Sequence, residues 1–316
     1  MTSIPLAAIS AWLPQAPLQR LHFDWLAGVE LAVLRLDLID PLISGNKWFK
    51  LAPHLRAAAE QHARGIISLG GAHSNHLHAL AAAGQRFSFA TVGLLRGHPQ
   101  DTPTVADLQR FGMQLHWLGY GGYRERHRAG FWAPWQVHYP DFLTVPEGGG
   151  GLPGALGCAG LPAMVAAQLP TLEWHDYHGW WLAAGTGTTL AGLVMGEGGQ
   201  RTVHGALAVP ADHGVGEQVQ ALLAEAGCDN TGFRLLDACR GGFARQDAEL
   251  LAFMAQCEAQ GGLPLEPLYT AKALLALLAL REAIERGEFC AGTRLIFVHT
   301  GGLQGRRAAS VAASEF

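Results

Sequence analysis

The sequence predicts an α/β protein built from two open, mostly parallel twisted sheets that are flanked by helices. Short apolar runs alternate with amphipathic helical stretches along most of the 316 residues. Repeated strand–helix–strand units of this kind place helices on both faces of a parallel sheet, and their number favours two sheets. Glycines gather where the predicted strands end, which is typical of backbone that approaches a ligand, although turns alone use many glycines.

The expected strands are apolar runs bounded by turn residues. They cover residues 29–39, 65–69, 89–95, 114–118, 142–145, 180–184, 203–209, 233–237 and 294–298. The expected helices are the amphipathic stretches between these runs, and Pro103 suits an early helical position because its fixed φ fits there. They cover residues 51–61, 75–85, 101–111, a stretch that follows Gly151 to about 168, 188–197, 214–226, 244–258 and 270–286.

A glycine-rich segment at 147–151 predicts the far boundary of a smaller domain that begins near Lys50. We therefore expect a small domain of residues 50–146 and a large domain made of residues 1–49 and 147–316. No repeat of 20–50 residues and no low-complexity tract interrupts this pattern.

Composition excludes several classes of function. Hydrophobic residues make up 49% and charged residues 15% of the chain, as in a well-buried globular protein. The net charge is -4 and no basic stretch stands out, so nucleic acid is not an expected partner, because phosphate neutralisation needs clustered Lys and Arg. No apolar run reaches membrane-spanning length.

The five cysteines are scattered and no CxxC pair occurs, so a disulfide framework is not expected and a reducing cytoplasm is the simplest location. The first 19 residues carry neither a basic region nor a long apolar core. A signal peptide is therefore not expected.

The stretch Ser44–Lys50 follows the first extended run and a turn at Asp40–Pro41, and it precedes a helical pattern. Lys47 therefore lies where a strand gives way to a helix. Partial burial lowers the pKa of a lysine and keeps part of the amine neutral, which a lysine that forms an imine requires. The alternative is a solvated lysine at a helix start.

Three further stretches follow predicted strands, at 70–75, 185–189 and 299–302. In open α/β sheets, ligands bind at the carboxyl ends of the strands. Together with Lys47 at the end of its own extended run, these stretches predict one shared site.

The turn made by Gly185, Thr186, Gly187, Thr188 and Thr189 lies between a tryptophan-rich run and a helical pattern. Glycines let backbone N–H groups point inward, hydroxyls add donors, and a helix N-terminus favours an anion. The composition predicts a phosphate cradle, but neither a Walker loop nor a dinucleotide fingerprint is present. A simple threonine-capped turn is the alternative.

Ser74 or Asn75 can cap a predicted helix and do no more, or the N–H groups there can hold a carboxylate. His73, His76 and His78 invite a metal site, but His78 would leave the shared helix face, and neither an acidic residue nor a Cys pair is adjacent. We expect no metal here.

Tyr269 precedes an apolar helix. It is either a core tyrosine with its hydroxyl satisfied or, at a helix mouth, a group that moves protons.

Taken in order, these stretches resemble the motif series of the aminocyclopropane-carboxylate deaminase and D-cysteine desulfhydrase family. The motifs are Ser44-Gly45-Asn46-Lys47, Ser74-Asn75-His76, Pro146-Glu147-Gly148-Gly149, Gly185-Thr186-Gly187-Thr188-Thr189, Pro267-Leu268-Tyr269-Thr270-Ala271-Lys272 and His299-Thr300-Gly301-Gly302. The resemblance runs from about residue 20 to residue 305. It implies a pyridoxal-phosphate enzyme of fold-type II, the tryptophan synthase β-like group, with the cofactor in the cleft between a large and a small domain.

The resemblance also implies roles for the residues that bind the cofactor. Lys47 would be the Schiff-base lysine and the main proton shuttle. Asn75 would form a hydrogen bond with the phenolic oxygen, residues 185–189 would hold the phosphate, and Thr300 would face the pyridine nitrogen. The cofactor supplies the electron sink, and the protein orients bonds and excludes water.

On the substrate side, the resemblance implies that Ser74 binds the carboxylate and assists proton transfer, with Asn75 and His76 beside it. Tyr269 would be the second acid/base or nucleophilic group.

Two positions depart from the family. The deaminase branch has a glutamate directly after the tyrosine, where this chain has Thr270, as the desulfhydrase branch does. A neutral hydroxyl does not hold a protonated pyridine as a carboxylate would, which favours elimination over cyclopropane opening. Phe243 stands where the family usually has a tyrosine.

We therefore expect a lyase or deaminase of the D-cysteine desulfhydrase type, acting on a small amino acid and releasing ammonia and a keto acid. Aminocyclopropane-carboxylate deaminase is the first alternative, and a racemase or a dehydratase is a further one. A non-catalytic pyridoxal-phosphate-binding protein and a metal-dependent hydrolase represent other classes. A cytoplasmic homodimer that binds neither nucleic acid nor membrane is the expected form.

Overall fold

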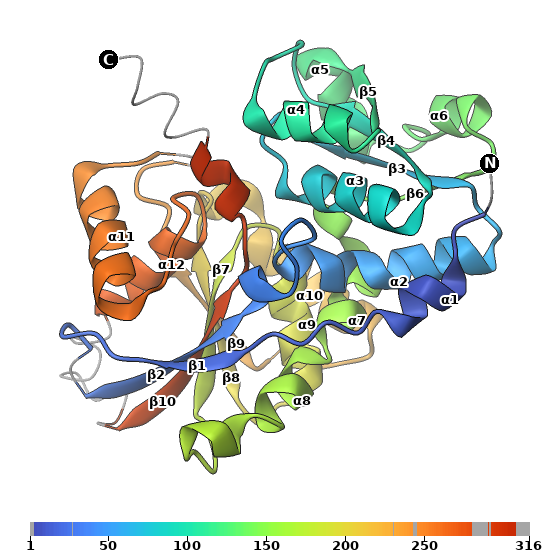
Figure 1. Cartoon of the computed structure of the whole chain (residues 1–316). Coiled ribbons are helices and arrows are strands. Elements are labelled where there is room, and N and C mark those ends of the chain that lie inside the picture. The colour runs from blue at the N-terminus through green and yellow to red at the C-terminus, as the bar shows by residue number, and fades with distance from the viewer. Residues whose placement is uncertain are drawn as a thin grey trace. The chain divides into compact units, whose positions relative to one another are not determined.

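The computed structural model of the chain describes residues 3–26, 28–229, 231–242, 245–279, 290 and 292–307. The contacts divide the chain into two compact units (Figure 1). Unit 1 consists of residues 1–14, 40–157 and 304–316, and unit 2 of residues 15–39 and 158–303. Each unit is built around its own sheet.

Unit 1 contains a four-stranded sheet in the order β5-β4-β3-β6, and every pair in it is parallel. Its strands are β3 (Gly65–Gly70), β4 (Ala90–Leu95), β5 (Gln114–Trp117) and β6 (Phe142–Thr144). All six residues of β3 are buried, as expected of a central parallel strand that is covered on both faces.

The helices of unit 1 are α1 (Leu6–Ala11), α2 (Asn46–Glu60), α3 (Asn75–Phe87), α4 (Pro103–Arg110), α5 (Gly119–Arg124), α6 (Ala133–His138) and α7 (Gly151–Cys158), which ends at the border of the unit. Helices α2 and α3 pack on β3. Ile67 and Leu69 pack with Tyr123 of α5, and aromatic residues around α6 lie against this cluster.

Unit 2 contains a six-stranded sheet in the order β1-β2-β10-β7-β8-β9. Its strands are β1 (Leu18–Leu21), β2 (Val29–Arg35), β7 (Gly179–Ala184), β8 (Thr202–Leu207), β9 (Phe233–Asp237) and β10 (Thr293–His299). The edge strand β1 runs antiparallel to β2, and the other strands of this sheet run parallel to their neighbours.

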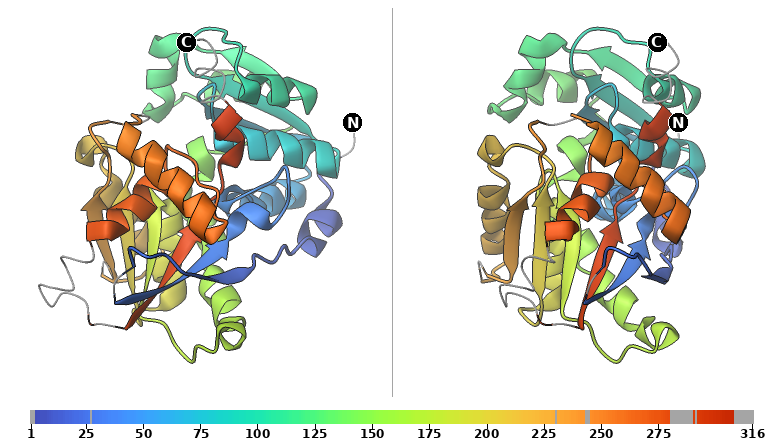
Figure 2. Two further views of the ribbon diagram at one scale, coloured as in Figure 1. Left: turned by 60° about the vertical axis from the view of Figure 1, so that its left-hand side comes forward. Right: turned by 90° about the vertical axis from the view of Figure 1, so that its left-hand side faces the viewer.

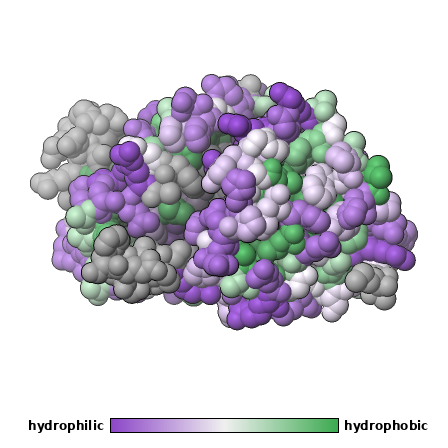
Figure 3. Space-filling model, turned by 90° about the horizontal axis from the view of Figure 1, so that it is seen from above, coloured by the Kyte–Doolittle hydropathy of each residue, from purple (hydrophilic) through white to green (hydrophobic). Residues whose placement is uncertain are grey.

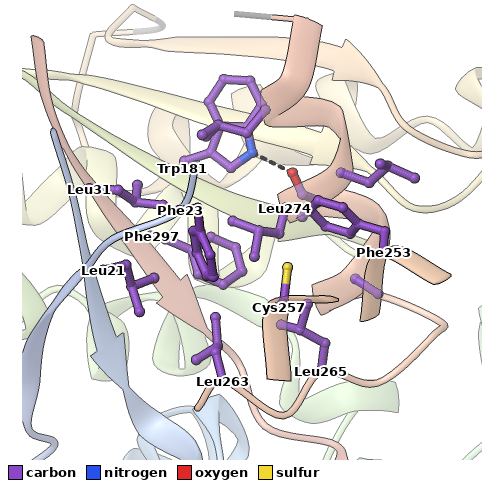
Figure 4. Close-up of a cluster of buried hydrophobic side chains, with 14 of the residues drawn as sticks. Leu21, Phe23, Leu31, Trp181, Phe253, Cys257, Leu263, Leu265, Leu274 and Phe297 are labelled. Carbon is purple, nitrogen blue, oxygen red and sulfur yellow. Dashed lines mark hydrogen bonds between the residues drawn. The ribbon is translucent and has the colours of Figure 1, made fainter. Parts of the chain in front are cut away.

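Helices cover both faces of the sheet in unit 2. They are α8 (Leu161–Ala166), α9 (Thr188–Glu197), α10 (Val215–Glu225), α11 (Ala248–Gly261) and α12 (Thr270–Ala276). Figure 2 shows α11 and α12 on one side of the sheet and α9 and α10 on the other. On the first side, Trp181 donates its indole N–H to the carbonyl of Ala273 at 2.6 Å, within a cluster that includes Phe253 and Phe297 (Figure 4).

The predicted fold class, two mostly parallel sheets flanked by helices, is confirmed. The element bounds differ in places for local reasons. Helix α2 starts at Asn46 rather than at residue 51, because Gly45 adopts a left-handed φ of 82° and starts the helix early. Helix α11 starts at Ala248 rather than at 244, because the Asp247 side chain accepts the N–H of Leu250.

The expected helix to about residue 168 is two helices, α7 and α8, and the expected helix 270–286 is α12 followed by a 3-10 turn at 277–279, with 280–286 outside the described residues. Strand β1 and the short helices α1, α5 and α6 were not predicted. The domain bounds at residues 49/50 and 146/147 stay a prediction.

In the ranges that the structure describes, no helix combines the length and the apolar character needed to cross a membrane. Hydrophobic residues are interspersed with hydrophilic ones on the face seen in Figure 3. The exposed large hydrophobic side chains include Tyr120 of α5 and Val137 of α6.

Helices α2 and α7 approach closely at Gly157. A Cβ added there would overlap the backbone oxygen of Phe49 and lie 2.9 Å from Cγ of Pro53. A backbone carbonyl cannot rotate away, so we expect Gly157→Ala to lower the free energy of unfolding by about 2–3 kcal/mol. Chemical denaturation measures this change.

Gly160→Ala is the matched control, because nothing lies within 4 Å of the added Cβ and the residue has an ordinary φ of -79°. We expect this control to change stability by less than about 0.5 kcal/mol. Equal stability of the two variants would contradict the close approach.

Candidate active site

Lys47 lies in the first turn of α2 and is half-buried. Lys50 and His54 follow three and seven positions later, and such spacings place side chains on one face of a helix. Lys50 is only 2% exposed and His54 only 7%. One face of the helix therefore carries three basic side chains, Lys47, Lys50 and His54. The last two of them are buried.

The N-terminus of α3 follows β3 through a short turn. Ser74 is the N-cap, and its Oγ accepts the N–H of Leu77 at 3.2 Å. The capping role is therefore present, as one of the two sequence interpretations had it. Because Oγ acts as an acceptor in this bond, the hydroxyl proton can still be donated to a ligand. A Cβ at Gly70 would collide with Ser74, so the close turn needs glycine there.

His76 is buried beneath this turn, at 2% exposure. Its Nε2 lies 2.7 Å from Ser68 Oγ, and that hydroxyl donates to the carbonyl of Val145 at 2.8 Å. A hydroxyl has one proton, so Ser68 must accept the bond from His76, and Nε2 carries the ring proton. Nδ1 is then an acceptor, and among the residues that the structure describes it has no hydrogen-bond partner.

Burial holds the pKa of His76 well below its ordinary value, and the charges of Lys47 and Lys50 lower it further. The ring is therefore neutral in the folded protein. Gly149, with a φ of 68°, lies beside Nδ1, and a Cβ added there would be 3.5 Å from this nitrogen. The predicted role of His76 in substrate binding stays a prediction.

The three histidines considered as metal ligands have different surroundings. His78 Nε2 lies 3.2 Å from Asp107 Oδ2 in a buried pair, whereas His76 pairs with Ser68. His73 is exposed. Within the described ranges, no three His, Cys, Asp or Glu side chains form a group that could hold a metal ion.

In unit 2, β7 ends at Ala184 and α9 begins at Thr188, so the turn at Gly185–Gly187 leads directly into a ten-residue helix. Gly187 has a φ of 71°, and a Cβ there would lie 2.5 Å from Cγ2 of Val219. The hydroxyls of Thr186 and Thr188 lie 3.1 Å apart. The turn therefore gathers two hydroxyls at a helix N-terminus, which is an arrangement suited to an anion.

Tyr269 lies beside this turn. A Cβ added at Gly185 would be 2.9 Å from Cε1 of Tyr269. The fold thus brings together two predicted site elements that are about eighty residues apart in the sequence.

The buried carboxylate of Glu266 fixes the start of α12. Its Oε1 accepts the N–H groups of Tyr269 at 2.8 Å and Thr270 at 2.6 Å, and its Oε2 accepts the N–H of Leu268 at 2.8 Å. Burial raises the pKa of Glu266, and these three N–H groups oppose the rise. The carboxylate positions the backbone of Tyr269, and no sequence motif had indicated it.

Thr270 is fully buried. Its Oγ1 accepts the N–H of Glu266 at 2.9 Å and donates to the carbonyl of the same residue at 3.2 Å. The single hydroxyl proton is therefore used inside the turn. Of the two threonines, Thr300 remains as the predicted partner of the pyridine nitrogen. Phe243, the other departure from the family, lies outside the described residues.

Thr300 follows β10, and the buried His299 fixes the turn that it begins. Nε2 of His299 lies 2.7 Å from the carbonyl of Pro264, and Nδ1 accepts the N–H of Gly301 at 3.2 Å. Oδ1 of Asp37 lies 3.2 Å from Nδ1 of His299, and Arg35 forms a bidentate ion pair with the Asp37 carboxylate. Burial lowers the pKa of His299, and the charge of Asp37 and the hydrogen bond with Pro264 oppose this shift.

Sequence reasoning named Lys47, Ser74, Asn75, Tyr269 and Thr300. It missed Glu266, which holds the backbone of Tyr269, and Gln304, which holds the amide of Asn75. It also missed Ser68 beside His76, Asp37 beside His299, and the buried Lys50 and His54 on the face of α2 that carries Lys47. Only Lys50 and His54 carried a signal, since their spacing from Lys47 fits one helix face.

The state of His76 is testable by NMR. We expect its ring to stay neutral, with the proton on Nε2, when the pH falls from 8 to 5.5, because burial and two lysines depress its pKa. Long-range proton–nitrogen spectra of labelled protein report both the tautomer and the charge, and His76→Gln identifies the signals. Protonation near the ordinary value of 6.5, or a proton on Nδ1, would contradict this assignment.

A stability measurement gives an independent check. The unfolded chain takes up a proton at this ring near pH 6.5 and the folded chain does not, so stability is fully present above that pH and falls below it. We expect His76→Gln to lessen this fall.

No family model matches the chain. Among curated proteins, the chain is 27% identical over 317 aligned residues to the bifunctional D-cysteine desulfhydrase/1-aminocyclopropane-1-carboxylate deaminase, mitochondrial, of Arabidopsis thaliana. The alignment covers 93% of this chain and 78% of the plant protein. A protein of Pyrococcus furiosus, whose name assigns it provisionally to 1-aminocyclopropane-1-carboxylate deaminase, is 26% identical, with 96% and 94% covered.

Solved structures show the same fold. A homologue of 1-aminocyclopropane-1-carboxylate deaminase superimposes with a TM-score of 0.80 at 22% identity, and the match covers 98% of each chain. Serine racemase from Dictyostelium discoideum has a TM-score of 0.66 at 13% identity, with 95% of this chain and 98% of the racemase covered. The resemblance of this chain to the aminocyclopropane-carboxylate deaminase and D-cysteine desulfhydrase family is therefore confirmed along nearly its whole length.

Proposed function

We propose that the protein is a pyridoxal-phosphate-dependent lyase or deaminase that acts on a small amino acid. The observation that carries the proposal is the end-to-end match to relatives named for these activities, in a chain that presents Lys47 in the first turn of α2. D-cysteine desulfhydrase-like β-elimination is the main candidate. Aminocyclopropane-carboxylate deamination is the second, because the name of the plant relative includes both activities.

The residues of unit 2 fit the phosphate of the cofactor. At the start of α9, backbone N–H groups that have no partner within the helix point out of its end. They attract an anion together with the helix dipole. The hydroxyls of Thr186 and Thr188 lie at the same turn, and the lack of side chains at Gly185 and Gly187 lets Tyr269 and Val219 pack against it. We infer that residues 185–189 bind the phosphate.

The residues of unit 1 fit the reactive end of the cofactor. Lys47 supplies an amine for covalent attachment, and Asn75 supplies an amide donor for the phenolic oxygen. We infer that Thr300 of unit 2 faces the pyridine nitrogen of the same cofactor. When bound, pyridoxal phosphate provides the electron sink for bond breaking at the α-carbon of an amino acid.

The protein contributes proton transfer and orientation. We infer that the N–H groups at the start of α3 and the hydroxyl of Ser74 hold the substrate carboxylate. The amine of Lys47 would be the base that takes the α-proton of the substrate. Tyr269, fixed by Glu266 next to Gly185, is the second group that can move a proton.

The environment of the pyridine nitrogen favours elimination. The residue after Tyr269 is Thr270 rather than a carboxylate, and its hydroxyl proton is used within its own turn. A hydroxyl at this position would not hold the pyridine nitrogen in its protonated form as a carboxylate would, and the carboxylate of Glu266 is engaged by three backbone N–H groups. A leaving group on the β-carbon relieves the developing charge, whereas opening of a cyclopropane offers no such group.

A cytoplasmic homodimer remains the expected form, with a small amino acid as its ligand and with neither nucleic acid nor membrane as partner. A non-catalytic pyridoxal-phosphate-binding protein is the alternative from another class. A screen of D- and L-amino acids for release of a keto acid separates the two.

The first test locates the cofactor. We expect a visible absorption band in the loaded protein, and borohydride reduction should fix the cofactor on Lys47, because this half-buried amine lies at the helix start that the family motif matches. Peptide mapping by mass spectrometry reads the position. Lys50 and Lys272 are internal controls in the same digest, and an adduct on either one, or on none, would show that the assignment is wrong.

The second test concerns the substrate. We expect D-cysteine or β-chloro-D-alanine to be turned over with a higher kcat/KM than aminocyclopropane-carboxylate, by roughly tenfold or more, because kcat/KM reports differential binding of the transition state. Assays of keto-acid release under identical conditions give the ratio. A preference for the cyclopropane substrate would refute the argument from Thr270.

A further inference from the structure

The segment that follows β10 is joined back to α3 and α4 inside unit 1. Nε2 of Gln304 donates to Oδ1 of Asn75 at 2.7 Å. Three residues later, Arg307 pairs with Asp107, which also holds His78 and Arg110. These two contacts fix residues 304–307 over the N-terminus of α3.

The contact with Gln304 determines how the amide of Asn75 is turned. An asparagine amide has one oxygen that accepts and one nitrogen that donates two hydrogens. In Asn75 the oxygen is occupied by Gln304, and this is the only hydrogen bond of the Asn75 side chain among the described residues. Turning the Asn75 amide over while the Gln304 amide keeps this orientation would bring two NH₂ groups together. The donor end is therefore the one left for a ligand.

We propose that Gln304 is a positioning residue that fixes the amide of Asn75 so that Nδ2 donates to the phenolic oxygen of the cofactor. The inference rests on the proposed function and deepens it. Gln304 touches neither cofactor nor substrate in this account. Its role is to prevent the amide of Asn75 from turning its oxygen toward the cofactor.

The orientation has an electrostatic consequence. With the cofactor bound to the lysine through a linkage that carries no proton, the phenolic oxygen would depend on Asn75 as its hydrogen-bond donor. A donor at this position therefore favours the deprotonated linkage and lowers its pKa. An acceptor turned toward the oxygen would repel it and raise that pKa.

Gln304→Glu tests this directly. The introduced carboxylate only accepts hydrogen bonds, so it draws Nδ2 of Asn75 toward itself and turns Oδ1 toward the cofactor. We expect the midpoint of the visible spectral titration to rise by about one pH unit, since a charge-assisted hydrogen bond has that magnitude. Gln304→Ala leaves the amide free to turn and should give a smaller rise.

Two controls separate orientation from tethering. Arg307→Gln weakens the second anchor of the segment and leaves the Gln304–Asn75 contact in place, so its midpoint should match that of the unchanged protein. In an Asn75→Ala background, Gln304→Glu should raise the midpoint much less, because the amide that it turns is absent and only the added charge acts.

The outcomes distinguish the inference from the function beneath it. An unchanged midpoint in Gln304→Glu, an equal rise in Arg307→Gln, or a full rise in the Asn75→Ala background would overturn the role of Gln304 while the cofactor still binds. Absence of a visible band in the unchanged protein after loading would overturn the proposed function itself. Circular dichroism confirms that each variant is folded.

Discussion

Backbone N–H groups at the N-termini of helices are the feature on which the rest of the site depends. Helices α3 and α9 each begin within a few residues of the end of a parallel strand, and α2 begins at a glycine with a left-handed φ. At such ends, N–H groups without a partner in the helix point outward, and the helix dipole makes them attractive to anions. A substrate carboxylate and a cofactor phosphate are the two anions that the proposed chemistry needs.

Buried polar networks hold these helix ends in place. In unit 1, Ser68 and Val145 fix the ring of His76 beneath the first turn of α3. In unit 2, Glu266 fixes the first turn of α12 and so the backbone of Tyr269. Of the described atoms in these two networks, Nδ1 of His76 is the one without a hydrogen-bond partner. A satisfied buried network restricts its members to one arrangement, which a reacting site requires.

The sequence predicts the regular elements well where a residue pattern is local. Strand β9 was expected at 233–237 and is found at Phe233–Asp237, because a short apolar run between turn residues has few other solutions. The six-residue helices α5 and α6 were missed, since two turns are too short to show a helical period. The early start of α2 was missed because it depends on the backbone of Gly45.

The candidate site, like the fold, could be predicted only in part from the sequence. Resemblance gave Lys47, Asn75 and Tyr269 their expected roles, and spacing alone left each of them ambiguous. The contacts that orient them join residues far apart in the chain: Gln304 and Asn75 are separated by 229 positions. No local sequence pattern predicts such a contact, because the two residues meet only through the packing of the whole unit.

We propose that the turn at 185–189 and the lysine at the start of α2 serve one cofactor. A crystal structure of the protein loaded with pyridoxal phosphate measures this most directly. We expect phosphate oxygens within hydrogen-bond distance, about 3 Å, of the N–H groups and hydroxyls of residues 185–189, while the aldehyde carbon of the same molecule is joined to Lys47. A phosphate bound elsewhere, with the turn at 185–189 contacting only protein, would contradict it.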